Sequence, residues 1–576
     1  MKRKNPHVVR IVVVSIFFLL WFGAVGVRAG YLQIVKGAWL SKKAADQSEQ
    51  ELILRGKRGT IYDSRQEALA VSIETTSITA NPRVMTDKNK AASQLAKAVG
   101  VPVSYIKTHL NTKRAFVWIK RQATPNEVAA VKKLAIKGID FVPEYSRFYP
   151  GKTLCSQVMG FAGIDGHGLE GVEFYYDKDL QGSENTITVF KDALGRNLDA
   201  DRLAGLNQAG NSLLLTIDGQ VQYIAEQALA EAVIDHKARS GMALVMVPQT
   251  GALLAVANYP FFNPNAQNKH DQDDWRNRAV TDPFEPGSTM KIFSAAAGLE
   301  SGKLDSNTIF YCENGIYMVG GHTVHDTKPY GWLSLQQVVK YSSNIGAVKL
   351  AQQIGPHVLY DHLNRFGFGL RTGVDSPGES PGSLANFKRW TSVDTGAIAF
   401  GQGVSVTALQ LITATAALAN DGLMMRPYVV QSVLDPNGKL LRAVAPQIVG
   451  QVVAPDTAKT VRQIMRSVVT EGGTGVKAEV DGYSACGKTG TAQKIEPDGS
   501  YSRHRYVASF VGFAPFERPA IAVLVVVDEP QNIYYGGLVA APAFSRIVRE
   551  TLGYMNVMPS EEWQRLRVAR ETGVNG

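Results

Sequence analysis

The sequence predicts an α+β protein in three parts: a single N-terminal transmembrane helix, an elongated α+β pedestal domain, and a C-terminal domain in which helices surround an antiparallel sheet. Three observations predict this architecture. Residues 11–27 form an uncharged apolar run, residues 52–198 mix short strand and helix patterns, and β-rich runs alternate with helical stretches after residue 212. A chain of 576 residues is long enough for two or more sizeable cores.

The first element is the apolar run Ile11–Val27, which lies between Arg10 and Arg28. Its length is near the lower limit for a membrane-spanning helix. The alternative is a cleaved signal peptide, but the apolar core of such a peptide is usually shorter, and Val27-Arg28-Ala29 is a poor cleavage site. We therefore expect an uncleaved, single-pass anchor in the cytoplasmic (inner) membrane. Basic residues before the span predict residues 1–10 in the cytoplasm and the rest of the chain outside it, on the periplasmic side.

A pedestal domain is predicted over residues 28–211. Residues 31–50 have the pattern of an amphipathic helix, and apolar residues recur at helical spacing in Ala91–Val99 and Pro125–Ile136. The stretch Asp201–Asn211 is polar and contains glycine, which predicts a boundary there.

The C-terminal domain is predicted over residues 212–556, with a polar tail at 557–576. Residues 213–218 are expected to form a strand that leads into a helix over Gln220–Ile234. The runs Ala243–Val247 and Ala252–Ala257 flank the turn Pro248-Gln249-Thr250-Gly251 and predict a β-hairpin.

Later strands are expected to join this hairpin in one antiparallel sheet. They lie around Lys488 and over the β-rich runs Tyr506–Phe513 and Ala520–Val527. Helices between Lys291 and Leu423 would pack around the sheet, which completes the α+β prediction.

Three short motifs follow one another in the C-terminal domain: Ser288-Thr289-Met290-Lys291, Ser342-Ser343-Asn344 and Lys488-Thr489-Gly490. They match S-x-x-K, a variant of S-D-N, and K-T-G, the set found together in serine β-lactamases and penicillin-binding proteins. S-x-x-K alone is weak evidence because it arises by chance in long chains. The three motifs in this order predict an active-site-serine enzyme.

Ser288 is the predicted nucleophile and Lys291 its general base. Pro286-Gly287 breaks the preceding structure and an alanine-rich run follows, so Ser288 is expected at a helix N-terminus with Lys291 one turn later on the same face. The helix dipole and burial both disfavour a charged lysine, and a neutral lysine can accept the serine proton.

The other two motifs supply polar groups around this pair. Ser342, in a turn between helical stretches, is suited to relay a proton to a leaving amine, and the Asn344 amide to bind a peptide backbone. Lys488 and the hydroxyls of Thr489 and Thr491 are suited to a terminal carboxylate. We expect Gly490 to let a bound peptide approach the strand closely, and the N–H groups of Ser288 and Thr491 to form an oxyanion hole.

With these motifs the chain resembles the class B penicillin-binding proteins, and in particular their septal (FtsI-type) members. Further segments carry the resemblance through most of the chain, and Cys155 and Gln157 depart from it, since relatives often have Ala and His there. The segments are Arg58–Asp63 followed by Leu69-Ala70, Arg147–Pro150, Gly168–Glu173 and Phe400–Gly403.

The resemblance implies a peptidoglycan D,D-transpeptidase that is inhibited by β-lactams. It would cross-link stem peptides with D-Ala-D-Ala donors through a Ser288 acyl-enzyme, with 28–211 as a non-catalytic, dimerisation-type domain. The implied partners are the membrane, a SEDS-family (FtsW-like) glycosyltransferase and other divisome proteins. No Glu-Asp-x-x-Phe-x-x-His segment for glycan polymerisation is present, and we place no residue to activate a deacylating water, which favours transfer over hydrolysis.

Three alternatives stay open at this point. A side-wall elongation transpeptidase has the same chemistry, whereas chain size, the lack of long insertions and the Arg58–Asp63 context favour division. A β-lactam sensor would need further membrane spans or a cytoplasmic effector, and neither is visible. Intact Ser288 and Lys291 argue against a non-catalytic scaffold.

Composition excludes other classes. The net charge of +10 could suggest nucleic acid, but there is no nucleic-acid motif, and anionic lipid or wall polymer is the simpler partner. Three cysteines, an odd number, argue against a disulfide framework. Cys486 is expected to pack in the core rather than line the site. Cys312 with His322, His325 and Asp326 matches no common zinc spacing, so no metal or other cofactor is predicted.

Overall fold

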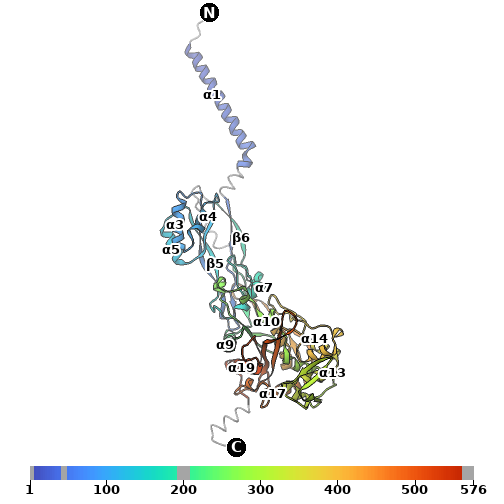
Figure 1. Cartoon of the computed structure of the whole chain (residues 1–576). Coiled ribbons are helices and arrows are strands. Elements are labelled where there is room, and N and C mark those ends of the chain that lie inside the picture. Colours follow the sequence, from blue (N-terminus) through green and yellow to red (C-terminus); the bar gives the residue numbers. More distant parts are fainter. Residues whose placement is uncertain (1–5, 41–48, 191–207, 561–576) are drawn as a thin grey trace. The chain divides into compact units, whose positions relative to one another are not determined.

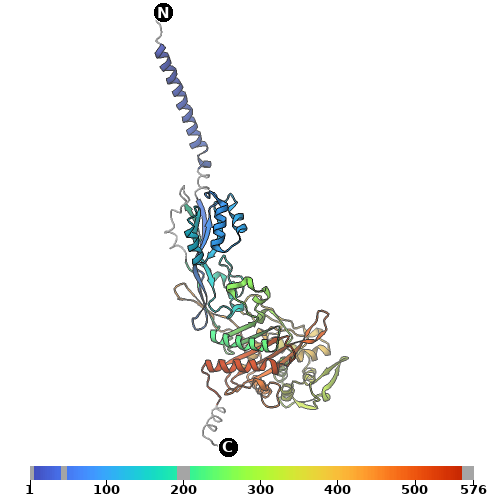
Figure 2. The ribbon, with the colours of Figure 1, turned by 60° about the vertical axis from the view of Figure 1, so that its left-hand side comes forward.

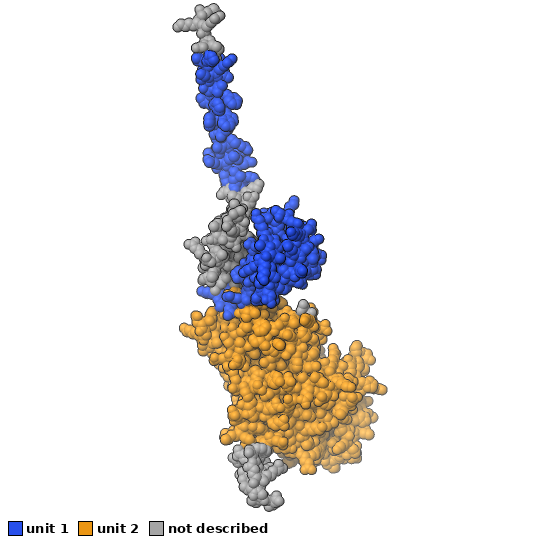
Figure 3. Space-filling view, turned by 90° about the vertical axis from the view of Figure 1, so that its left-hand side faces the viewer, with its two compact units in different colours: residues 1–57, 74–144, 182–209 blue, residues 58–73, 145–181, 210–576 orange. Residues whose placement is uncertain are grey.

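The computed structural model describes residues 6–40, 49–190 and 208–560 (Figure 1). The chain forms two compact units (Figure 3). Unit 1 contains residues 1–57, 74–144 and 182–209, and unit 2 contains 58–73, 145–181 and 210–576. The boundary between the units is therefore not a single point at residue 211. Two segments of the predicted pedestal, 58–73 and 145–181, belong to the same unit as the C-terminal part. The predicted domain limits stay a prediction.

Unit 1 begins with the apolar helix α1 (Pro6–Gly30), which contains the predicted span and continues as a π-helical turn over Tyr31–Val35. Within the described ranges, His7–Val35 is the one helix that is long and apolar enough to cross a membrane. The predicted helix over residues 31–50 is wrong at its end, because residues 49–50 already belong to strand β1 (Glu49–Arg55). Residues 41–48 lie outside the described part.

The rest of unit 1 mixes helices and strands, as predicted. Helix α5 (Pro125–Lys133) begins with a capping box in which Thr124 and Glu127 satisfy each other's backbone N–H groups. In α3, Ala91, Leu95 and Val99 are buried at successive helical turns and form a small core with the strands. The other elements are α3 (Lys88–Val99), α4 (Val103–Leu110), β4 (Val117–Ala123), β6 (Glu184–Phe190), which pairs with β1, and the larger parts of β3 (Ala68–Ala80) and β5 (Ile139–Phe148).

The predicted strand after residue 212 forms, but it does not join the large sheet of unit 2. Strand β7 (Ser212–Leu215) pairs in parallel with β2 (Ile61–Tyr62) and antiparallel with β15 (Val430–Leu434). Strand β16 (Leu440–Ala443) pairs with the other side of β15. Segments that are far apart in sequence are therefore joined by backbone hydrogen bonds within unit 2.

The large sheet of unit 2 has five antiparallel strands in the order β18-β19-β20-β8-β9. This confirms that the hairpin, the strand at Lys488 and the two later runs form one sheet. The strands are β8 (Ser240–Met246), β9 (Leu253–Tyr259), β18 (Cys486–Ile495), β19 (Tyr501–Ala514) and β20 (Ile521–Asp528).

Both faces of this sheet are buried, and alternate residues of β8 enter two different cores. Met242 and Leu244 lie in one core with residues of α11 and α16, whereas Ala243 and Val245 lie in another with α9 and α19. Figure 2 shows α9 and α19 side by side in green and red. These four covering helices are α9 (Gly219–Asp235), α11 (Lys291–Glu300), α16 (Ala408–Ala419) and α19 (Ala541–Tyr554).

The remaining elements of unit 2 surround these layers. The helices are α6 (Ser156–Met159), α7 (Gly171–Tyr175), α8 (Asp177–Leu180), α10 (Arg278–Thr281), α12 (Leu335–Tyr341), α13 (Asn344–Ile354), α14 (Pro356–Arg365), α15 (Ser392–Ala399), α17 (Pro455–Val469) and α18 (Gly536–Val539). The paired strands are β10 (Ile309–Tyr311) with β13 (Trp332–Ser334), β11 (Ile316–Val319) with β12 (His322–His325), and β14 (Leu423–Met425) with β17 (Ile448–Gln451).

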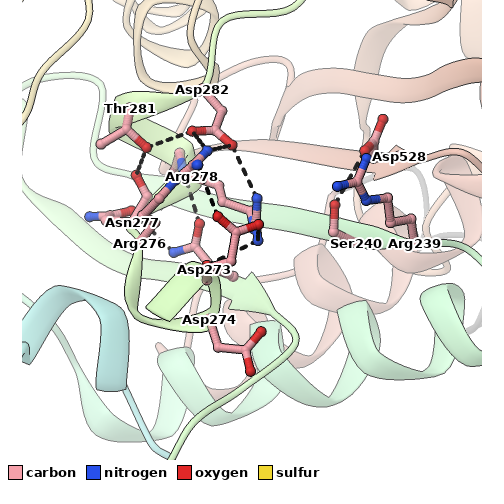
Figure 4. A network of polar contacts seen from close by, with 12 residues as sticks. Arg239, Ser240, Asp273, Asp274, Arg276, Asn277, Arg278, Thr281, Asp282 and Asp528 are labelled. Atoms are coloured by element: carbon pink, nitrogen blue, oxygen red, sulfur yellow. Dashed lines mark hydrogen bonds and ion pairs between the residues drawn. The ribbon is translucent and has the colours of Figure 1, made fainter. Parts of the chain in front are cut away.

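The segment that leads to the predicted nucleophile is fixed by a network of ion pairs (Figure 4). Arg276 and Arg278 each contact both Asp273 and Asp282. The Thr281 hydroxyl donates a further hydrogen bond to Asp282. Four charges of alternating sign therefore hold the turn around α10, a few residues before Ser288.

A second cluster, the arginine–glutamate cluster, consists of Arg58, Arg147, Glu173 and Asp177. Glu173 is fully buried and accepts from Arg58 Nε and Arg147 Nε, each at 2.6 Å. Arg58 also donates to Asp177 Oδ1 at 2.6 Å, and Arg147 donates to the carbonyl of Gly59 at 2.7 Å. Segments singled out by the family resemblance thus meet in one place inside unit 2.

The charges of this cluster compensate one another. Burial raises the pKa of the Glu173 carboxyl, but Arg147 and Arg58 lower it by more, so the net shift is downward. Glu173 therefore stays ionised between two guanidinium groups whose side chains are each only 5% exposed.

We predict that Glu173→Gln destabilises the fold, because it leaves two buried arginines without their shared carboxylate. Breaking a buried pair by removing one partner typically costs about 3–5 kcal/mol. Thermal and denaturant unfolding of the purified protein would measure the loss. Glu67→Gln, at an exposed position of unit 2, is the control, and equal stability of the two variants would contradict a structural role for the cluster.

Candidate active site

Ser288 lies in a short 3₁₀ turn, Gly287–Met290, that runs directly into α11. The predicted placement of the serine and Lys291 one turn apart at a helix start is therefore what the structure shows. Ser288 is partly buried, and Lys291 is 1% exposed. The turn holds the hydroxyl at the protein surface while the lysine is enclosed.

Two glycines shape this turn. Gly287 has a φ of +54°, and a Cβ there would lie 2.8 Å from the carbonyl oxygen of Thr491. Position 401 has room only for glycine, because a Cβ there would lie 2.1 Å from the Gly287 carbonyl oxygen. The Gly287 N–H donates to the Gly401 carbonyl at 3.1 Å. The Phe400–Gly403 segment thus packs directly under the turn that carries Ser288.

The Lys291 amine is surrounded by four oxygen atoms. Nζ lies 2.7 Å from the backbone carbonyl oxygen of Ser342 and 2.7 Å from Asn344 Oδ1. It lies 3.0 Å from Ser288 Oγ and 3.2 Å from Ser342 Oγ. The two closest partners can only accept hydrogen bonds, whereas the two hydroxyls can also donate.

This arrangement suits a neutral lysine. A neutral amine has two N–H groups and one lone pair, so both hydrogens can go to the carbonyl oxygens and the lone pair can face the Ser288 hydroxyl. Burial lowers the pKa of Lys291 to about 7, although the nearby Asp326 carboxylate acts in the opposite direction. Lys291 is therefore able to accept the Ser288 proton near neutral pH.

Ser342 and Asn344 are positioned by a turn between two helices, as expected. Ser342 ends α12 in a left-handed conformation, with φ of 62°, and Ser343 caps the start of α13. The left-handed residue turns its own carbonyl toward Lys291. The Asn344 amide nitrogen donates to the carbonyl of His325 at 2.9 Å, which leaves its oxygen for the lysine.

Asp326 supports this turn and was not predicted as part of the site. Its Oδ1 accepts from the N–H groups of Asn344 at 2.5 Å and Ile345 at 3.1 Å, and its Oδ2 accepts from the Ser343 hydroxyl at 2.6 Å. The sequence associated Asp326 with Cys312 and two histidines as a candidate metal group. In the structure the carboxylate is occupied by the start of α13, and the Ser343 hydroxyl also contacts Cys312 Sγ.

The K-T-G strand adds a second buried amine. Lys488 Nζ donates to Ser342 Oγ at 3.0 Å and to Thr489 Oγ1 at 3.1 Å. Burial, and to a smaller extent the charge of Lys291, lower the pKa of Lys488 well below its usual value. Thr474 was not predicted as part of the site, and its Oγ1 lies 3.0 Å from Thr489 Oγ1. The Ser342 hydroxyl is therefore shared between two lysines.

Gly490 and Thr491 make contacts within the protein that the sequence did not predict. A Cβ on Gly490 would lie 2.1 Å from Ser509 Oγ and 2.9 Å from Thr289 Cγ2. The absent side chain thus makes room for close packing between β18, β19 and the Ser288 turn. The Thr491 hydroxyl accepts a hydrogen bond from the Gly536 N–H at 3.1 Å, which ties α18 to the same strand.

Cys486 packs in the core, which is the interpretation the sequence favoured. It is fully buried, its thiol contacts the carbonyl of Phe513 at 3.7 Å, and burial raises its pKa. All three cysteines are free thiols. The site therefore contains a serine, two amines and a shared hydroxyl, a set suited to acyl transfer through a serine ester.

Comparison with known proteins gives two family matches. The penicillin binding protein transpeptidase domain matches residues 241–549, and the penicillin-binding protein dimerisation domain matches residues 53–215. The first match contains the whole site described above. The second contains most of unit 1 together with the arginine–glutamate cluster.

Individual relatives agree over almost the full chain. The probable peptidoglycan D,D-transpeptidase PenA of Neisseria gonorrhoeae is 35% identical, covering 96% of this chain and 94% of its own. Stage V sporulation protein D of Bacillus subtilis is 34% identical (96% and 86%), and the peptidoglycan D,D-transpeptidase FtsI of Escherichia coli is 35% identical (92% and 89%).

A solved structure gives the same result for the fold. Penicillin binding protein 3 of Mycobacterium tuberculosis, complexed with aztreonam, superposes with a TM-score of 0.69 at 29% identity, covering 88% of this chain and 98% of that one. The family matches, the identities and the fold lead to one conclusion. The chain belongs to the class B penicillin-binding proteins, and it is a peptidoglycan D,D-transpeptidase of that type.

Proposed function

We propose that this enzyme cross-links peptidoglycan stem peptides through an acyl-enzyme on Ser288. The observation that carries the proposal is the Lys291 amine, buried and 3.0 Å from Ser288 Oγ, with its two shortest contacts to carbonyl oxygens. Lys291 takes the hydroxyl proton as Ser288 Oγ attacks the carbonyl between the two D-Ala residues of a donor peptide. The C–N bond then breaks and the terminal D-Ala leaves.

Ser342 completes the proton path in this proposal. Its hydroxyl lies 3.2 Å from Lys291 Nζ and 3.0 Å from Lys488 Nζ, so it can pass the proton to the departing amine nitrogen. An acceptor amine next attacks the ester, Ser288 regains its proton, and the cross-link is formed. A β-lactam would acylate Ser288 by the same first step and remain attached.

Substrate binding is assigned to the K-T-G strand. Lys488, Thr489 and the hydroxyl of Thr491 would bind the terminal carboxylate, and the Asn344 amide would bind the peptide backbone. The N–H groups of Ser288 and Thr491 would stabilise the oxyanion. The proximity of Gly287 to the Thr491 carbonyl supports this pairing, because it brings the two backbones together.

Within the family we propose a role in the division septum. The chain size, the absence of long insertions and the context of Arg58–Asp63 support it. Depletion of the protein in its source cell would distinguish the roles, because filaments indicate a division enzyme and round cells indicate the alternative, side-wall elongation.

The N-terminal helix is proposed as an uncleaved anchor with its N-terminus in the cytoplasm, and unit 2 on the other side of the membrane. Basic residues before the span support this orientation. A partner polymerase of the SEDS family (FtsW-like), with other divisome proteins, is the proposed neighbour. Gly23 and Gly26, where a Cβ would meet no atom of this chain, leave room for a close helix contact in lipid.

For the proposed function, the first prediction concerns the nucleophile. Ser288→Ala should abolish covalent labelling by a fluorescent penicillin while the protein still folds, because no other serine is predicted to have a lysine base. Ser500→Ala, at an exposed turn, should label normally. Peptide mapping of the labelled protein checks the assignment, and a label on any other residue would refute it.

The second prediction concerns the base. Lys291→Ala should slow acylation by about 10²–10⁴-fold, the usual worth of general-base catalysis. Lys291→Arg should fail too, because arginine stays protonated. With a Lys291 pKa of about 7, the wild-type acylation rate should rise as pH increases through 7, where the amine loses its proton.

Stopped-flow acylation across pH 5.5–9, a range of roughly two units either side of that pKa, measures this profile. Lys388→Ala, at an exposed position, should retain the wild-type rate and profile. Fast acylation by Lys291→Arg, or a rate that falls as pH rises through 7, would argue against a neutral-lysine mechanism.

A third prediction concerns the anchor. If α1 contacts a partner helix through its glycines, the double variant Gly23→Leu with Gly26→Leu should fail to replace the native protein in cells, although it inserts and still labels with penicillin. Ala24→Leu, on a different face of α1, is the matched control. Full complementation by the glycine variant would reduce the span to a simple anchor.

A further inference from the structure

Unit 2 contains a cavity of about 360 Å³ that shares no residue with the active site described above. This volume lies in the range of small-ligand sites. Its walls come from α7 and the residue after it, from Asp375 between α14 and α15, and from the segment between α16 and α17. Six of the lining residues carry the argument: Tyr175, Tyr176, Arg426, Tyr428, Arg442 and Gln447.

Arg426 is the cation of the cavity whose charge is not matched by a carboxylate. Its Nε donates to the carbonyl of Gly373 at 2.6 Å, and its Nη1 donates to Gln447 Oε1 at 3.0 Å. Both acceptors are neutral. In the part of the chain that the structure describes, no carboxylate lies within ion-pair distance of Arg426, and its Nη2 forms no hydrogen bond.

The acidic group in the cavity wall, Asp375, is already satisfied. Its Oδ1 accepts from the N–H of Val429 at 2.7 Å, and its Oδ2 accepts from the N–H of Val430 and the Tyr176 hydroxyl, each at 2.8 Å. The other arginine, Arg442, pairs with Asp179 at 3.3 Å. Asp375 and Arg442 therefore have partners within the protein. The guanidinium group of Arg426 keeps one edge that a ligand could bind.

The remaining walls are aromatic. The rings of Tyr175 and Tyr176 lie 5.2 Å apart and are tilted toward one another, and Tyr175 is 47% exposed. Tyr428 adds a third ring. Tyrosine faces bind the apolar side of a ligand, and a free guanidinium edge fits a planar carboxylate.

We propose that this cavity is a second, non-catalytic binding site for the carboxylate of a small peptidoglycan fragment, with Arg426 as the anion-binding group and the tyrosines against the body of the ligand. The choice of peptidoglycan as the source rests on the proposed function, whereas the carboxylate class rests on the cavity alone. The carboxylate can come from a stem peptide or from the lactyl group of a muramic sugar that carries no peptide, because that group is an amide once a peptide is attached. Both carboxylates have the same binding chemistry.

The test uses the full-length protein in detergent with Ser288 blocked by penicillin, and mass spectrometry confirms the acylation. The probe is N-acetylmuramyl-tripeptide, which lacks the D-Ala-D-Ala donor, titrated by calorimetry. N-acetylmuramic acid and the free tripeptide are titrated separately and identify the source. A tripeptide with every carboxylate amidated tests the anion requirement. If penicillin does not acylate the protein, the proposed function is wrong. The proposed cavity site can then still be tested by titrating the unblocked protein.

Two variants test the cavity by different means. Arg426→Gln removes the charge, and Ala445→Trp places a large ring at an exposed lining position where it fills the space without disturbing the core. Arg371→Gln is the matched control, since Arg371 is an exposed arginine near Gly373 that does not line the cavity. Penicillin labelling of each variant verifies the fold.

We expect saturable binding of the muramyl tripeptide that weakens at least tenfold, about the worth of one hydrogen-bonded charge, in Arg426→Gln and in Ala445→Trp. Arg371→Gln should bind normally, and the amidated peptide should bind at least tenfold more weakly than the free acid. The proposal is overturned if neither the muramyl tripeptide nor N-acetylmuramic acid binds saturably, if both cavity variants bind as the wild type does, or if the amidated peptide binds as well as the free acid.

Discussion

The exclusion of water from one amine is the constraint on which the rest of the site depends. Lys291 and Lys488 are both almost completely buried, and one serine hydroxyl lies between them. Two ammonium groups at this spacing in a buried site would repel each other strongly. The enclosure therefore keeps at least one amine neutral, and the two carbonyl oxygens around Lys291 decide how its hydrogens and lone pair are directed.

Three separate parts of the chain create that enclosure. Helix α11 carries Lys291, the turn between α12 and α13 supplies the carbonyl and amide oxygens, and β18 carries Lys488. Each part has a structural support of its own: Gly401 beneath the Ser288 turn, Asp326 at the start of α13, and the pairing of β18 with β19. A displacement of any one would admit water and restore the ordinary basicity of lysine.

The sequence predicted the features that local patterns encode. The three motifs identified Ser288, Lys291, Ser342 and Lys488 because their residue types and spacing are chemically specific, and continuous β-rich runs identified the strands of the large sheet. Residues that support the site only through tertiary contacts were not predicted. Asp326 lies 18 residues before Asn344 in the chain, and nothing in its neighbourhood indicates a helix cap there.

Similar limits explain the differences in the fold. The two-residue strand β2 is too short for a periodic pattern, so its parallel pairing with β7 could not be predicted. The packing of Gly490 against Ser509 and Thr289 could not be predicted, because these close neighbours are visible only in three dimensions. The helix expected over residues 31–50 does not include residues 49 and 50, because their pairing with β6 outweighs a local amphipathic pattern.

The discontinuous course of the chain through unit 2 has a consequence for how such genes can recombine. A single crossover near residue 211 would join residues 58–181 of one parent to the catalytic residues of another. The hybrid would have to preserve contacts across the junction, including the bond from the Tyr176 hydroxyl to Asp375, the bond from the Cys155 N–H to Glu226, and the ladder between β2 and β7. A crossover inside the catalytic segment keeps both members of every such pair from the same parent only if it falls after Asp375. Hybrid genes that still encode a folded protein should therefore have their junctions toward the C-terminal strands.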